Sequence, residues 1–588
     1  MSKLLKLGVA EGMPSECWEL AFNRLNEDDL KSVSLVCKDF LATSNLVKKR
    51  LKPKHLDVTL LSRHLKRFTQ LKEIDFRGFK GNLDEAICEM ARSSGLVCLE
   101  TLCFAGKSFK TQSLRKLGSN PNMKKNLKHL NCGGTKRLHD KDLVVIANLF
   151  PNLEQLNIKN FRPTAGKHIF TDYGIESLAS KLKVLKKLFI AGAHLFTDQS
   201  VIALSLNCAF LEHVVIHGLP KVNDSVKVTE HGIGLLRNRP NLKHLSIARI
   251  NKSLSNITIE NSISHAKSLI SLCFYCMDIS DKLLMEIGKA KLQLKRFQIV
   301  FCRGFTGSGL CMLDYKYLHH LCIRNHFNAE ILDLDEGIRE IILKGDDHVA
   351  NLTCIDISSF EVTTSTLFLL STKCCSLVEI RFCGAKLSGQ DNNIPLSKNH
   401  KLQKLHLCHS DDITDELLEQ IGHILPSLKL LSLDGCFRVT SRGIEAILKS
   451  CKYITELNLR GYTKAKMMEA NSEVAQVNLE ELILEDSAID DEGLAVIATK
   501  CPQLVHINLR GCREVTTNGI KQMVKNIKTL RRFTVGSDSE KVSVELLEWM
   551  LSTGYLASLK EIRFPKQTIL TKGLKEAFMD RGCIMYFG

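Results

Sequence analysis

A single apolar pattern, L-x-x-L-x-L or a close variant, occurs nineteen times between Leu71 and Phe564. The repeats begin at positions 71, 99, 127, 153, 185, 211, 242, 269, 294, 318, 352, 377, 402, 428, 454, 479, 504, 530 and 559, mostly in steps of 24 to 29 residues. At that spacing each repeat supplies one strand and one helix, and neighbouring repeats bury each other's apolar faces. The pattern therefore predicts a long solenoid, in which chain length does not count separate globular domains.

The repeat that begins at Leu428 indicates how the two faces of a strand divide. Side chains alternate along a strand, so Leu431 and Leu433 lie on one face. Leu430 and Ser432 lie on the other. We expect the first pair to be buried and the second pair to line an inner surface.

The segments between strands carry helix-start signals. An apolar residue, then a Thr or Asp, then a second apolar residue at the fourth helical position form a hydrophobic staple around a helix cap. This pattern occurs at Val439-Thr440, Ile413-Thr414, Val515-Thr516 and Ile489-Asp490. Apolar residues at helical spacing follow, which predicts helices with one buried stripe.

Many of the twenty-two cysteines recur at fixed positions of the repeat. Cys208, Cys374, Cys451 and Cys501 lie three residues before the start of a repeat, and Cys302, Cys436 and Cys512 lie eight residues after one. A small buried hydrophobe with a weak S–H donor would recur in this way. Cys273 and Cys276 have C-x-x-C spacing, but no second pair completes a zinc site. We therefore expect no metal and no cofactor.

These units resemble the cysteine-containing subclass of leucine-rich repeats. The match is clearest from Leu428 to Ile444 and from Leu504 to Ile520, and it extends over roughly residues 68 to 588. The resemblance implies an α/β fold, a curved solenoid of about nineteen repeats with parallel strands on the concave face and helices on the convex face. Such a fold offers a large surface for binding.

A different sequence, residues 13 to 52, precedes the repeats. Met13-Pro14 is followed by Glu16, by apolar residues at helical spacing, and by the run Ser34-Leu35-Val36-Cys37-Lys38 with Phe40. This order resembles an F-box, a three-helix motif that docks on a Skp-type adaptor and so joins a cullin scaffold and a RING subunit. So short a segment buries little core alone, and we expect an apolar face that packs on a partner.

The resemblance assigns residues 10 to 52 to the adaptor-binding domain, 53 to 67 to a connecting segment and 68 to 588 to the solenoid. The predicted adaptor contacts are Met13, Pro14, Trp18, Phe22, Leu25, Leu30, Leu35, Val36 and Phe40. An F-box ahead of such repeats implies the substrate-recognition subunit of an SCF (Skp–cullin–F-box) ubiquitin ligase. The repeats would bind a target protein and present it for ubiquitination.

No catalytic motif accompanies these features. The sequence has no nucleophile elbow, P-loop or H-E-x-x-H, and its histidines lie on separate repeats. We therefore expect a non-catalytic subunit that raises the effective concentration of its target. Two other functions stay open: a hormone-receptor-like F-box co-receptor that needs a small molecule, and an interaction scaffold outside any SCF complex.

Location and charge narrow the partners. No apolar run approaches the ~20 residues that span a bilayer, and the first residues lack a signal-peptide core, so we expect a soluble protein of the cytoplasm, the nucleus or both. The net charge of +17 favours an acidic partner. No nucleic-acid-binding signature accompanies that charge, and direct nucleic-acid binding is not expected.

The inward strand positions carry histidines and cations that we interpret as the substrate surface. The candidate contacts are His213, His244, His320, Arg381, Lys404, His406, Arg460, His506, Arg510 and Arg532. Arginine forks suit an acidic or phosphorylated segment, and protonated histidines would strengthen its binding. Long steps of 32, 31 and 34 residues after Leu153, Leu211 and Leu318 leave room for loops over this surface.

Overall fold

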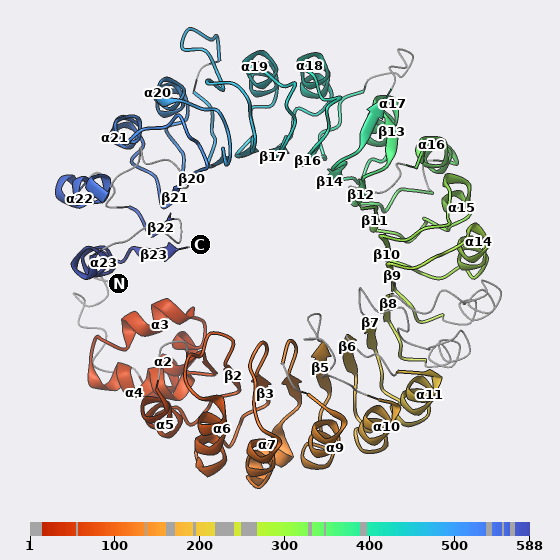
Figure 1. Cartoon of the computed structure of the whole chain (residues 1–588), viewed down its shortest axis with the longest axis vertical. Helices are drawn as coiled ribbons and strands as arrows, with labels where there is room; N and C mark the ends of the chain where they lie inside the picture. The colour runs from red at the N-terminus through yellow and green to blue at the C-terminus, as the bar shows by residue number, and fades with distance from the viewer. Residues whose placement is uncertain are drawn as a thin grey trace. The chain divides into compact units, whose positions relative to one another are not determined.

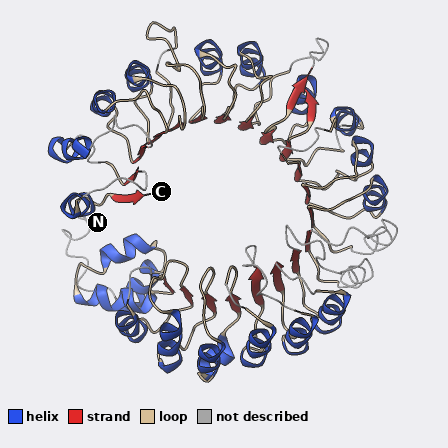
Figure 2. Ribbon diagram, viewed as in Figure 1, coloured by secondary structure: helices blue, strands red, loops and turns tan. Residues whose placement is uncertain are grey.

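The structure is a computed structural model that describes residues 14–53, 57–135, 138–159, 171–191, 196–217, 240–248, 267–326, 332–345, 348–388, 397–474, 476–536, 544–554, 558–564 and 571–587. Contacts divide the chain into an N-terminal unit, Met1–Met277 with Ala290–Leu292, and a C-terminal unit, Asp278–Lys289 with Gln293–Gly588. Within each unit, strands form the inner side of a curve and helices form the outer side (Figure 2).

The N-terminal unit contains a helical head and the first part of the repeat array (Figure 1). The head consists of α2 (Ser15–Phe22), α3 (Glu27–Val33) and α4 (Lys38–Val47). The strands are β1 (Arg50–Leu51), β2 (Glu73–Asp75), β3 (Thr101–Cys103), β4 (His129–Asn131), β5 (Gln155–Lys159), β6 (Lys187–Ala191), β7 (His213–His217), β8 (His244–Ala248) and β9 (Ser271–Tyr275). The helices of the array are α5 (Val58–Arg67), α6 (Leu83–Arg92), α7 (Thr111–Gly118), α8 (Pro121–Asn126), α9 (Asp140–Leu149), α10 (Asp172–Lys181) and α11 (Asp198–Asn207).

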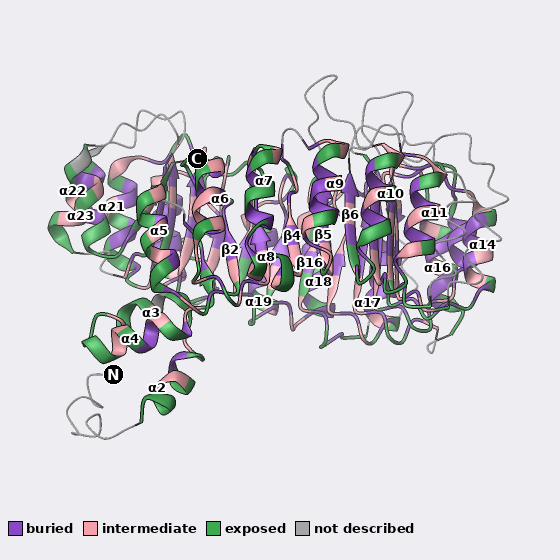
Figure 3. Cartoon of the chain, turned by 90° about the horizontal axis from the view of Figure 1, so that it is seen from below, coloured by how far each residue is buried: buried purple, intermediate pink, exposed green. Residues whose placement is uncertain are grey.

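The strands of this unit pair in parallel and in chain order. Equivalent positions of successive repeats are register partners, because each repeat has an apolar residue at the same point of its strand. Leu130 of β4 is the register partner of Leu156 of β5, which pairs in turn with Leu188 of β6. All three side chains are at most 1% exposed. The core is thus a ladder of aliphatic side chains between the strands and the helices, as the purple residues of Figure 3 indicate.

In the C-terminal unit, strands and helices alternate along the chain as they do in the N-terminal unit. Its strands are β10 (Arg296–Val300), β11 (His320–Arg324), β12 (Cys354–Ser358), β14 (Glu379–Arg381), β16 (Lys404–His406), β17 (Leu430–Ser432), β18 (Glu456–Asn458), β19 (Glu481–Ile483), β20 (His506–Arg510), β21 (Arg532–Gly536), β22 (Glu561–Phe564) and β23 (Ile584–Phe587), while β13 (Glu361–Thr363) and β15 (Lys386–Ser388) form a separate pair. Its helices are α14 (Asp281–Lys289), α15 (Gly307–Cys311), α16 (Asp335–Leu343), α17 (Thr364–Lys373), α18 (Asp415–Ile424), α19 (Ser441–Ser450), α20 (Asp491–Lys500), α21 (Thr517–Asn526), α22 (Val544–Thr553) and α23 (Lys572–Asp580).

The predicted phase of the repeats agrees with the strands. In all nineteen repeats the strand begins two residues after the leading apolar residue. Leu431 and Leu433 are buried, as expected, and Leu431 pairs with Leu457 of the next strand. The predicted class, an α/β solenoid of leucine-rich repeats with parallel strands, is confirmed.

The structure contains two short strands and one helix of the repeat array that the sequence pattern did not predict. Strand β1 pairs with β2, and β23 pairs with β22, so the parallel pairing runs one strand further in each unit. The segment 53 to 67, expected to be a connection, contains α5, which packs on α6 as the other repeat helices pack on theirs. The boundary at residue 52 stays a prediction.

The predicted helix caps are present. The side chains of Thr440, Thr414 and Thr516 accept hydrogen bonds from backbone N–H groups in the first turns of α19, α18 and α21. Asp490 does the same for α20, accepting from Gly493 N at 2.8 Å.

A second role of the helix starts was not predicted: they interlock successive repeats. Asp415, the first residue of α18, accepts a 2.8 Å hydrogen bond from Thr440 N and a second one from Thr440 Oγ1, at the cap of the next helix. The same two bonds join Asp491 to Thr516. A carboxylate in the first turn therefore serves its own helix dipole and the cap of the neighbour.

The repeated cysteines are buried free thiols, as predicted. Cys451 Sγ lies 3.1 Å from Leu425 O, and Cys436 Sγ lies 2.8 Å from Leu407 O, both one repeat earlier. These thiols therefore fill space in the core and donate weakly to carbonyl groups of the preceding repeat.

The expectation that the long steps carry loops over the inner face stays a prediction. Residues 160 to 170 in the step after Leu153, 218 to 239 in the step after Leu211, and 327 to 331 with 346 to 347 in the step after Leu318 lie outside the described residues. The step after Leu318 also contains the repeat helix α16, whose Asp335 accepts from Thr363 N at 2.7 Å, as in the other interlocks.

Candidate functional site

The three helices of the head close around an aromatic cluster. Phe22 and Val33 are buried, and Trp18 and Phe40 pack against them. The ring centroids of Trp18 and Phe40 are 4.6 Å apart, and those of Phe22 and Phe40 are 5.1 Å apart in an edge-to-face arrangement. The head therefore has a core of its own.

This core includes several of the predicted adaptor contacts. Phe22 is buried, at 3% exposed, and Trp18, Leu25, Leu30 and Phe40 are partly buried against it. Packing within the head thus accounts for part of their apolarity, and their contact with an adaptor stays a prediction.

Other apolar residues of the head face solvent (Figure 3). Leu35 is 86% exposed and Val36 44% exposed, both in the turn between α3 and α4, and Leu20 on α2 is 70% exposed. Pro14, at the cap of α2, is exposed too. We call Pro14, Leu20, Leu35 and Val36 the head surface; Met13 lies outside the described residues.

Polar contacts fasten the head to the first repeat. Lys49 Nζ donates to Asn23 Oδ1 over 2.5 Å, and Arg67 Nε of α5 donates to Asn45 Oδ1 over 2.8 Å. The head is thus attached to the array at a fixed position within the N-terminal unit.

The inner face of the N-terminal unit brings two predicted histidines together. The rings of His213 and His244 are 4.9 Å apart, and Phe189 lies 4.9 Å from His213 on its other side. Burial, and then the neighbouring His244, lowers the pKa of His213 to about 4. This histidine is neutral near pH 7 and adds no charge for an acidic target.

The histidines of the C-terminal unit behave in the same way. Burial is the main cause that lowers the pKa of His320, His406 and His506 below the usual value. The expectation that protonated histidines strengthen binding is therefore wrong for these positions near neutral pH.

Most of the predicted arginines already have acidic partners on the same face. Arg381 Nε donates to Glu379 Oε1 over 2.5 Å. Arg532 lies 3.1 Å from Glu481, and Arg460 lies 3.2 Å from Asp486. The inner face is thus a network of paired charges, less basic than a count of arginines indicates.

One strong pair was missed by sequence reasoning. Arg324 of β11 donates through Nε over 2.8 Å to Asp356 of β12, whose side chain is 2% exposed. The partners are 32 residues apart, and only an aspartate between two isoleucines of a strand hinted at it.

Two of the predicted cations lack an ion pair with any described residue: Lys404 and Arg510, both exposed. Arg510 lies at a hollow of about 460 Å³ on the inner face. We call this hollow the C-terminal pocket; it is lined by Glu485, His506, Asn508, Arg510, Arg532, Thr534, Val535, Gly536, Glu561, Arg563, Phe564 and Tyr586. Of the predicted contacts it gathers three, and the others are spread along β7 to β18.

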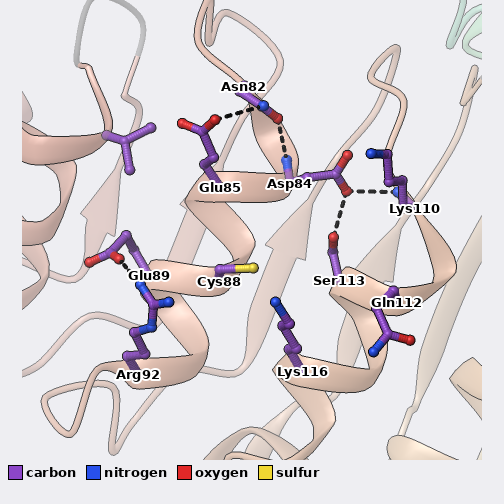
Figure 4. Close-up of a pocket in the computed structure, with 11 residues that line it drawn as sticks. Asn82, Asp84, Glu85, Cys88, Glu89, Arg92, Lys110, Gln112, Ser113 and Lys116 are labelled. Carbon is purple, nitrogen blue, oxygen red and sulfur yellow. Dashed lines mark hydrogen bonds and ion pairs between the residues drawn. The ribbon is translucent and has the colours of Figure 1, made fainter.

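A second hollow, of about 520 Å³, lies on the outer side of the N-terminal unit between α5, α6 and α7 (Figure 4). Its acidic groups are all occupied: Asp84 accepts from Lys110 N and Ser113 Oγ, Glu85 from Asn82, and Glu89 from Arg92. The bonds of Asp84 join α6 to the start of α7, the other two lie within α6 and its cap, and we assign no ligand to this hollow.

Across the described ranges, no group of His, Cys, Asp and Glu side chains is arranged to hold a metal ion. Every described helix is too short or too polar to span a bilayer.

Comparison with known proteins gives short similarities. No protein-family model matches the chain. It is 27% identical over 128 residues to the antagonist of mitotic exit network protein 1 of Eremothecium gossypii, and 31% identical over 120 residues to that of Candida glabrata. It is 27% identical over 130 residues to the F-box protein SKIP1 of Arabidopsis thaliana. These alignments cover 21%, 20% and 22% of this chain and 33%, 24% and 41% of the relatives, so the chain spans less than half of each.

Two solved structures align over longer stretches. A chain of the Rad7 and Elc1 complex of yeast is 15% identical, with a TM-score of 0.37, and the alignment covers 79% of this chain and 90% of that chain. An internalin (inlF) of Listeria monocytogenes is 16% identical, with a TM-score of 0.35 and coverage of 68% and 88%. At TM-scores this low, neither structure bears on function.

Proposed function

We propose that this chain, an F-box/leucine-rich-repeat protein, is the substrate receptor of an SCF ubiquitin ligase. The head docks on a Skp-type adaptor, and through it on the cullin and RING subunits, while the inner face of the repeats binds a target protein. Ubiquitin transfer then belongs to the other subunits, and this chain contributes proximity. The similarity to the F-box protein SKIP1 supports the proposal.

The observation that carries the proposal is the head surface. Leu35 and Leu20 are more than two-thirds exposed, although the head has a complete aromatic core behind them. Apolar side chains so open to water on a small helical module are typical of an interaction site.

The test is co-purification of the full chain with a Skp-type adaptor. Leu35→Asp combined with Val36→Asp should reduce adaptor affinity by about 100-fold or more, because anchors of this kind contribute ~2 kcal/mol each. The thermal melting of the chain should stay unchanged, because both side chains are exposed.

The matched control is Leu206→Asp, on α11 of the same unit and 70% exposed, which should leave adaptor recovery intact. Phe22→Ala should also lose the adaptor, but together with protease resistance of the head, since it opens the core. Equal adaptor recovery from Leu35→Asp/Val36→Asp and from Leu206→Asp would contradict the proposal and favour a scaffold outside the SCF complex.

A further inference from the structure

We propose that the C-terminal pocket is the anchor site for an oxyanion, the carboxylate or phosphate of a peptide side chain. The inference deepens the proposed function, because it assigns that peptide to the target protein. The pocket volume of about 460 Å³ lies within the ~300–1,000 Å³ typical of ligand sites. Four neighbouring strands, β20 to β23, supply its walls.

The carboxylates around the pocket already accept hydrogen bonds or ion pairs from within the protein. Glu485 accepts from Asn508 Nδ2 over 3.1 Å, and Glu561 accepts from Arg563 Nε. Outside the lining, Glu481 pairs with Arg532 over 3.1 Å. Each of these carboxylates thus has a donor partner within the protein.

The donors are in surplus. A guanidinium carries five N–H donors, and Arg532 and Arg563 use only part of theirs on these carboxylates. Arg510 makes no ion pair with any described residue. The pocket therefore offers directed N–H groups with too few acceptors, which is the arrangement that suits a bidentate carboxylate or phosphate.

Other lining residues contribute an aromatic ring and a hydroxyl group beside the arginines. The guanidinium of Arg563 lies 5.5 Å from the ring centroid of Tyr586, which holds its plane against an aromatic face. Thr534 adds a hydroxyl to the lining, while Val535 and Phe564 belong to the buried core next to it. Arg510, which has no ion pair with a described residue, distinguishes the pocket from positions such as Arg381, whose charge is met by a neighbouring carboxylate.

The experiment measures binding of fluorescent peptides to the full chain without adaptor. Three peptides share one uncharged sequence and differ in a central block of glutamate, phosphoserine or glutamine. The glutamate or the phosphoserine peptide should bind at least about tenfold more tightly than the glutamine peptide, because each charge-assisted bond contributes about that factor. The stronger of the two identifies the oxyanion as carboxylate or phosphate.

Arg510→Gln should remove this preference, and Arg296→Gln should keep it. Arg296 is a matched control: it is an exposed arginine at the start of β10 in the same unit, without an ion pair to described residues and outside the pocket. Both side chains are exposed, so equal melting temperatures check that both variants fold. A preference unchanged in Arg510→Gln, equal binding of all three peptides, or binding of free inorganic phosphate by a chain that binds neither charged peptide overturns the inference.

The adaptor co-purification experiment and the peptide-binding experiment can give negative results independently of each other. If the chain prefers oxyanion peptides but binds no adaptor, the oxyanion-site proposal would stand and the ubiquitin-ligase proposal would be rejected. Adaptor binding without any oxyanion preference would do the reverse.

Discussion

The replacement of Gly443 by alanine tests the interlock between repeats. A Cβ atom at Gly443, near the start of α19, would lie 2.3 Å from Asp415 Oδ1 and 2.9 Å from Asp415 Cα. Asp415 accepts the two hydrogen bonds from Thr440 that join α18 to α19. The added methyl group must therefore push the carboxylate away from the cap.

The magnitude follows from those two bonds. Hydrogen bonds to a charged group contribute ~1.5–3 kcal/mol each, and the half-buried position of this pair favours the lower value. Alanine in a helix regains ~0.5–1 kcal/mol relative to glycine. The difference between these two terms predicts that the free energy of local opening of α19 falls by about 2 kcal/mol. Such a decrease corresponds to roughly 30-fold faster amide exchange in α19.

Hydrogen exchange followed by mass spectrometry measures this local opening. Gly573→Ala is the control: it lies near the start of α23, behind the cap Thr571, where a Cβ atom meets nothing within 4 Å. It should leave exchange unchanged or slow it. In Asp415→Ala, the further change Gly443→Ala should cost little, because the clashing carboxylate is gone. Additive effects in that cycle, or unchanged exchange in Gly443→Ala, would refute the interlock.

Two further predictions concern ionisable groups of the inner face. Since the pKa of His213 is about 4 in the folded chain against 6.5 ordinarily, the unfolded chain takes up the proton first, and stability should fall as pH drops from about 6.5 to about 4. His213→Gln should flatten this part of the denaturant-midpoint profile, and an unchanged profile would show that the ring is not desolvated. A hydrogen bond from Cys383 lowers the pKa of the Cys408 thiol, while burial raises that of Cys451. Iodoacetamide at neutral pH should therefore label Cys408 before Cys451 by mass spectrometry, and Cys383→Ser should weaken the difference; the reverse order of labelling would exclude a stabilised Cys408 thiolate.

The sequence alone was sufficient to predict the repeat and the position of the strand within each repeat. Burial in a solenoid repeats with the chain, so the leading apolar residues indicated where the strand of each of the nineteen repeats begins, and caps such as Thr440 marked where helices begin. The buried cysteines could be placed for the same reason, since Cys451 occupies an equivalent position in its repeat to Cys501. Each of these features depends on neighbours along the chain.

The head shows where that reasoning fails. Trp18 and Leu35 are both apolar and both match the F-box pattern, but Trp18 is partly buried against the core of the head and Leu35 faces water. Apolarity indicates burial against something, and only the packing of the three helices decides whether the partner is the head itself or another protein.

The inner face depends on the tertiary structure even more. The sequence by itself determined which side chains reach this face, including His506, Arg510 and Arg532 of the C-terminal pocket. It did not determine their charge state, because Arg532 is paired with Glu481, 51 residues earlier, and burial keeps His506 neutral. In a parallel solenoid the neighbours of a side chain lie one or two repeats away, so its pairing and its pKa are decided only when the repeats stack.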